Sequence, residues 1–140
     1  MSNSPAQTSA TPRRLGRSIL AILAGFAVAV VLSILTDFIL HKTHFYPPLG
    51  QPNSSGQLAV ATAYRTLFGI LSAWVTARLA PYQPMTHALI GGAIGTVLAL
   101  AGAIATWNMP LGPHWYPIAL VVLALPTAWV GGKLRLMQLA

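Results

Sequence analysis

The chain has 140 residues, of which 55% are hydrophobic and only 6% are charged. Soluble domains carry about a quarter charged residues, so this composition excludes an ordinary soluble globular protein. The net charge of +7 would suit a nucleic-acid partner, but the basic residues stand at the ends of apolar runs, where lysine and arginine meet anionic lipid headgroups. We therefore expect an integral membrane protein whose partner is the lipid bilayer and not a nucleic acid.

The polar N-terminal stretch, residues 1–12, contains two prolines and predicts a disordered tail. The remainder, residues 13–140, is expected to form one transmembrane domain. Its first apolar run, Ile19–Leu40, is long enough to cross a bilayer as a helix of roughly 20 residues.

Three further apolar runs of similar length follow along the chain. With their flanking residues, the four predicted spans are 18–41, 57–79, 87–107 and 114–134. Ser54 and Gln57 have the spacing of a capping box that opens the second span. Because the connections are short, successive helices should be antiparallel neighbours. The predicted fold class is all-α, an integral membrane bundle of four transmembrane helices.

Lysine and arginine are distributed unequally between the two sides of the predicted bundle. The side of the termini holds Arg13, Arg14, Arg17, Arg78, Lys133 and Arg135. The other side holds only Lys42. Since positive charge favours the cytoplasmic side, both termini are predicted to be cytoplasmic. The loop of residues 41–57 then faces outward.

Small residues recur at helical spacing in every span, as expected where helices approach closely in lipid. The glycines predicted to pack the helices are Gly25, Gly69, Gly91, Gly92, Gly95 and Gly102. Gly91 and Gly95 also form a G-x-x-x-G pair, so contact with a second copy of the chain is an alternative. Pro126 lies inside the fourth span and predicts a helix kink, because proline removes a backbone donor.

Two charged residues, Asp37 and Arg65, lie well inside the spans, and Asp37 is the only acidic residue of the chain. An unpaired charge at a helix centre costs about 2.5–3.5 kcal/mol on insertion scales. Both residues lie in the outer half of the membrane and on the small-residue stripes, so we expect them to form an ion pair. The pair has two interpretations: a structural pin between the first two spans, or an outward-opening site where Asp37 binds a proton or cation.

Three of the four histidines, His41, His44 and His114, fall on the outer side. Asp37, His41 and His44 have the spacing D-x-x-x-H-x-x-H, which would place them on one side of a continued helix. Imidazoles with a carboxylate can bind zinc, copper or iron, so a metal or haem site is one interpretation. The two prolines that follow His44 should end the helix near it, which favours interfacial anchors instead. No metal or cofactor is assigned.

Three segments, ATAYRT (61–66), TARLAP (76–81) and GPHWYP (112–117), resemble those of small bacterial inner-membrane proteins of uncharacterised function. The resemblance implies a multi-pass protein of the bacterial inner membrane and supplies no activity. The residues point away from an enzyme, because the chain has no cysteine and no second carboxylate for acid–base work.

Three functional hypotheses remain open from the sequence. The first is a structural or accessory subunit, or a modulator, of a membrane complex. The second is a small homo-oligomeric transporter or channel using Asp37 and Arg65. A lone carboxylate in the first of four spans is similar to the pattern of small multidrug transporters, although those carry a glutamate near the membrane middle. The third is the metal or haem site at the outer face.

Overall fold

The computed structural model of the protein describes residues 11–140. It contains four α-helices: α1 (Thr11–Lys42), α2 (Ser55–Leu79), α3 (Pro84–Thr106) and α4 (Trp115–Leu139). All four are long and apolar enough to cross a membrane, and the described residues form no strand. The prediction of an all-α bundle of four membrane-spanning helices is therefore confirmed.

The helix boundaries extend some of the predicted spans. Because α1 begins at Thr11, the last two residues of the predicted tail are helical, and the rest of that tail, residues 1–10, lies outside the described residues. The predicted capping box is confirmed at the start of α2. The Ser54 hydroxyl accepts from the Gln57 backbone N–H at 3.2 Å, and the Gln57 side chain accepts from the Ser54 N–H at 2.8 Å.

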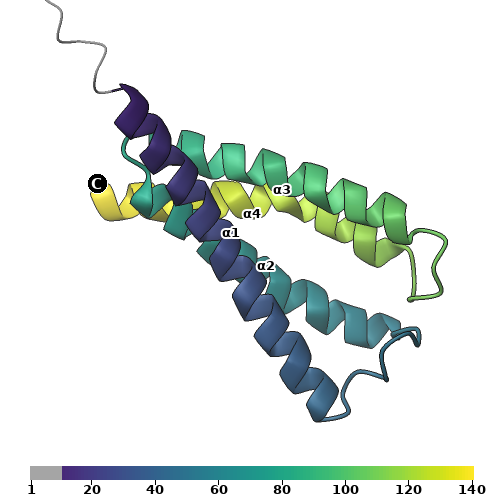
Figure 1. Ribbon diagram of the computed structural model, residues 1–140. Helices are drawn as coiled ribbons and strands as arrows, with labels where there is room; N and C mark the ends of the chain where they lie inside the picture. The colour runs from purple at the N-terminus through teal and green to yellow at the C-terminus, as the bar shows by residue number, and fades with distance from the viewer. Residues whose placement is uncertain (1–10) are drawn as a thin grey trace, which may run out of the picture.

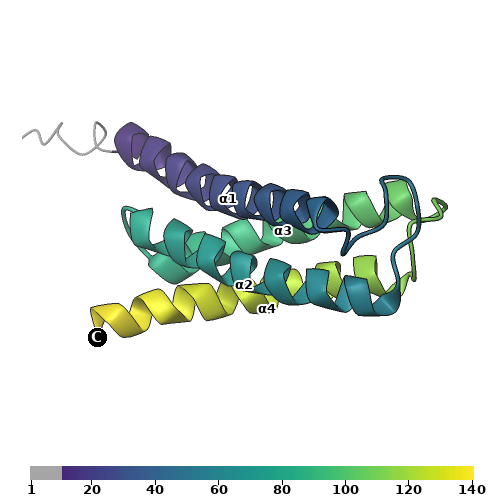
Figure 2. The same ribbon diagram turned by 90° about the horizontal axis from the view of Figure 1, so that it is seen from below.

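The helices form two antiparallel hairpins, α1–α2 and α3–α4 (Figure 1). The start of α1, the end of α4 and the α2–α3 connection lie together at one end. We call the opposite end, with the connections 43–54 and 107–114, the distal end (Figure 2). The two hairpins pack together near the termini and diverge toward the distal end (Figure 1). The main contact between them is made by α2 and α4.

The interior of the bundle is built from small side chains, while the large apolar side chains face outward. A buried cluster at the terminal half consists of Ala73, Ala77, Ala88 and Ala128. By contrast, Val97 and Ile104 are 65% and 71% exposed. This arrangement suits a bilayer, because lipid tails solvate large apolar groups and helices associate through close packing of small ones.

Three of the predicted packing glycines lie at helix contacts. A β-carbon on Gly25 would lie 2.7 Å from the Ser72 carbonyl oxygen of α2. One on Gly69 would lie 3.2 Å from the Thr127 hydroxyl of α4, and one on Gly92 would overlap the Ala128 side chain. Gly25 therefore allows α1 and α2 to pack closely, Gly69 does so for α2 and α4, and Gly92 for α3 and α4.

The other predicted glycines have more room. A β-carbon on Gly95 would lie 4.0 Å from the Phe26 ring, and one on Gly91 or Gly102 would have no neighbour within 4 Å among the described residues. Contact of Gly91 with a second copy stays a prediction. Gly131 of α4, which was not among the predicted glycines, is packed more tightly than these three. A β-carbon there would lie 2.8 Å from the Trp74 backbone nitrogen of α2. Pro126 lies within α4, which continues through it as one helix.

Candidate functional site

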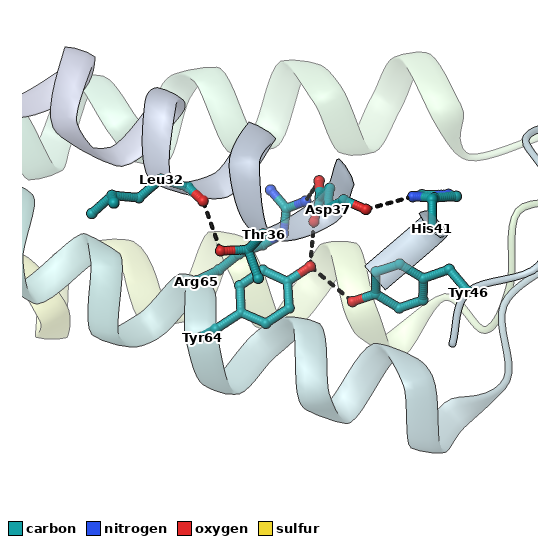
Figure 3. A network of polar contacts seen from close by, with 7 residues as sticks. All are labelled: Leu32, Thr36, Asp37, His41, Tyr46, Tyr64 and Arg65. Atoms are coloured by element: carbon teal, nitrogen blue, oxygen red, sulfur yellow. Dashed lines mark hydrogen bonds and ion pairs between the residues drawn. The ribbon is translucent and has the colours of Figure 1, made fainter. Parts of the chain in front are cut away.

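The centre of the candidate site is the contact between Asp37 of α1 and Arg65 of α2. The Arg65 Nη2 donates to the Asp37 Oδ2 at 2.6 Å (Figure 3). The two side chains are 32% and 31% exposed, so the pair is largely buried between the helices. Asp37 stands about 7 Å before the end of α1 and Arg65 about 15 Å after the start of α2, at 1.5 Å per residue. The length of the arginine side chain spans the difference.

Tyr64 completes the ligation of the carboxylate. Its hydroxyl donates to the Asp37 Oδ1 and accepts a hydrogen bond from the Tyr46 hydroxyl at 2.8 Å (Figure 3). Each carboxylate oxygen therefore has a donor of its own, one charged and one neutral. Sequence reasoning missed both tyrosines. The only available signal was that Tyr64 precedes Arg65 in the chain.

Tyr46 lies in the connection between α1 and α2 and is fixed by its surroundings. It is 7% exposed and packs against His41 with 5.2 Å between ring centroids. Burial raises the pKa of the Tyr46 phenol above its usual 10.0, because the charged phenolate is poorly solvated there. The group therefore stays protonated at neutral pH. It can then donate to Tyr64, which in turn donates to the carboxylate.

The three histidines predicted at this end do not converge on one point. His41 Nδ1 donates to the Asp37 backbone carbonyl at 2.8 Å, and His114 Nε2 donates to the Trp107 carbonyl at 2.9 Å. His44 follows the end of α1 with a φ of 63°, so the helical spacing that would align it with His41 is lost. Within residues 11–140, no three metal-binding side chains are grouped. His41 and His114 do line one pocket together with Asp37, and the metal or haem site stays a prediction.

A pocket of about 380 Å³ opens beside the ion pair, between the diverging halves of the two hairpins. We call it the distal pocket. Among the described residues its lining has one anion and one cation, Asp37 and Arg65, together with His41 and His114. The other walls come from all four helices and both distal connections. The connections meet over it, since the Asn53 N–H donates to the Leu111 carbonyl at 2.9 Å. Gly102, where an added β-carbon would meet nothing within 4 Å in residues 11–140, lines this pocket.

A second pocket of about 180 Å³ lies on the side of Arg65 nearer the termini. It is lined mostly by small residues, including Gly69, Gly91 and Gly95. Arg65 lines both pockets. The ion pair therefore stands at the boundary between an open distal space and a narrower space in the middle of the bundle.

No family model, curated protein or solved structure matches this chain. With one carboxylate whose two oxygens already accept hydrogen bonds, the site offers charge pairing and hydrogen bonding, while the pocket beside it offers space for a small molecule.

Proposed function

We propose that the protein is a small accessory subunit or modulator of a membrane complex, without enzymatic activity of its own. The observation that carries this proposal is the engagement of Asp37, the only acidic side chain in the sequence, by Arg65 and Tyr64. A carboxylate that couples transport to protons or cations must be able to release its partners. Here it instead joins α1 to α2.

The remaining polar groups support the same assignment. His41 and His114 each donate to a nearby backbone carbonyl, and Thr36, Thr62 and Thr66 each donate to a carbonyl of their own helix. Such bonds satisfy polar groups inside a membrane and leave the helix surfaces apolar. A chain of this kind acts through the surfaces it offers to other membrane proteins. We place it in the bacterial inner membrane with both termini in the cytoplasm, on the six-to-one distribution of lysine and arginine.

The proposal is tested by native mass spectrometry of the chain extracted gently from its own membrane. The expected result is a complex of fixed stoichiometry with a different polypeptide. Recovery of the chain only as a monomer or a homo-oligomer would contradict the accessory role.

A second candidate, a small homo-oligomeric transporter or channel, is favoured by one observation. The two pockets meet at Arg65, so separating Asp37 from Arg65 would join an open distal space to the middle of the bundle. On this hypothesis, filling the distal pocket with Gly102→Leu abolishes uptake of a solute into liposomes. Uptake that is the same in protein-free liposomes and in liposomes with the wild-type chain rejects it.

A further inference from the structure

We propose that the distal pocket binds an uncharged, membrane-soluble molecule through a carbonyl-type hydrogen-bond acceptor, as found in quinones and ketone-bearing lipids. The inference concerns the pocket's own chemistry and does not depend on the accessory role. It follows from the charge balance of the lining, the donors left free there, and the size and position of the space.

The charge balance of the pocket selects for a neutral ligand. Its one cation and one anion, Arg65 and Asp37, are already paired at 2.6 Å. An ionic ligand would therefore bring a charge for which no opposite charge remains, and the cost of desolvating that charge would not be recovered. An uncharged molecule meets no such penalty.

Two lining residues of the pocket, Arg65 and Tyr116, offer hydrogen-bond donors to a ligand. Arginine carries five N–H groups, and within residues 11–140 the Arg65 guanidinium uses only its Nη2 in a hydrogen bond. The hydroxyl of Tyr116, a second lining residue on α4, makes no hydrogen bond within the described part of the chain. A buried donor without an acceptor costs free energy. A ligand oxygen that accepts from these groups would therefore be favoured over a ligand without one.

The size and position of the pocket indicate how such a ligand would reach it. About 380 Å³ is within the range of ordinary small-molecule sites, roughly 300–1,000 Å³. The wall is largely apolar, with Leu58, Ala61, Ala103 and Leu120 among its residues. Since the pocket lies among membrane-spanning segments, a molecule dissolved in the lipid phase is the natural occupant. Its apolar body would displace little ordered water and would contact the aliphatic wall.

Two substitutions separate ligand binding from folding. Gly102→Leu adds a side chain at a pocket-lining position where a β-carbon would have no neighbour within 4 Å among the described residues, so it takes up pocket space and also favours the helix. Tyr116→Phe removes only a hydroxyl. Ala105→Leu makes a similar addition at an exposed position of the same helix that does not line the pocket, so it is the matched control.

The test is calorimetric titration of the full chain in lipid nanodiscs with decylubiquinone, after subtraction of empty nanodiscs. Dodecylbenzene replaces the quinone as a probe without an acceptor, and laurate as an anionic one. We expect saturable quinone binding that Gly102→Leu and Tyr116→Phe each weaken about tenfold, while Ala105→Leu stays within about twofold. Both comparison probes should bind at least about tenfold more weakly than the quinone.

Several results would overturn the proposal. They are absence of saturable quinone binding, equal affinity of Gly102→Leu and Ala105→Leu, or equal binding of dodecylbenzene or laurate. Circular dichroism and gel filtration of each variant show whether a loss of binding comes from unfolding. The accessory role is tested separately, by native mass spectrometry. Absence of quinone binding would therefore not contradict that role, and absence of a partner polypeptide would not contradict ligand binding in the pocket.

Discussion

Breaking the Asp37–Arg65 pair from one side should be more damaging than removing both partners. Loss of one member of a buried pair costs about 3–5 kcal/mol, whereas exposed pairs contribute about 0–1 kcal/mol. With each side chain about one-third exposed, we expect Asp37→Asn or Arg65→Leu alone to lower the free energy of unfolding by about 2–3 kcal/mol. The double variant strands no charge and should lose about 2 kcal/mol less than the sum of the two single losses.

The assay is reversible unfolding in mixed micelles, titrated with sodium dodecyl sulfate and followed by circular dichroism. The matched control combines Asp37→Asn with Arg17→Leu, because Arg17 is an exposed cation at the opposite end of α1. Its losses should add within about 0.5 kcal/mol, as for independent sites. If the Asp37–Arg65 losses add equally well, the two residues do not stabilise each other and the structural interpretation of the pair is refuted.

Three further predictions follow from particular contacts and use the same unfolding assay. Tyr64→Phe should cost about 1.5–3 kcal/mol, because it removes a hydrogen bond to a charged group, and Tyr46→Phe should cost about 1 kcal/mol; the reverse order would mean that Tyr64 is not the carboxylate's donor. Gly131→Val should cost at least about 2 kcal/mol, because its side chain would overlap α2, whereas Gly91→Val, with open space around it, should cost under about 1 kcal/mol; equal losses would contradict the packing. His87→Leu should cost about 1–2 kcal/mol, because the buried imidazole bonds the Ser18 hydroxyl of α1 at 2.7 Å, and hydrogen exchange near the start of α1 should accelerate; unchanged exchange there would exclude this link.

The spans could be predicted from the sequence because their signal is local. A run of about 20 apolar residues is sufficient for a membrane helix, and the capping box of Ser54 and Gln57 fixes the start of α2 by residue type and spacing alone. The Asp37–Arg65 contact was also open to prediction, since one anion and one cation at similar depth have few other partners in lipid.

The hydrogen-bonding partners of the carboxylate could not be predicted in the same way. Tyr64 reaches it from α2, and Tyr46, in the loop, reaches the Tyr64 hydroxyl. The approach of both depends on where α1 ends. The end of α1 also explains why the predicted alignment of the histidines was not found. A continued helix would align His41 with His44, but α1 ends at Lys42 and the backbone turns at His44, which separates them.

The distal pocket lay beyond sequence reasoning because it results from the divergence of the two hairpins. Gly92 and Gly102 are both glycines of α3, yet the first packs against Ala128 and the second lines open space. Spacing along one helix gives the face on which a glycine lies. It does not give the distance to the next helix, which is set by side chains on both partners.

The central claim is that Asp37 is a structural partner of Arg65 and not a group that moves protons. The most direct test measures the decay of an imposed pH gradient in liposomes that contain the wild-type chain, the Asp37→Asn variant or no protein. The account predicts the same slow decay in all three. A fast decay with the wild-type chain that disappears in a folded Asp37→Asn variant would contradict it and would assign the carboxylate a role in proton transport.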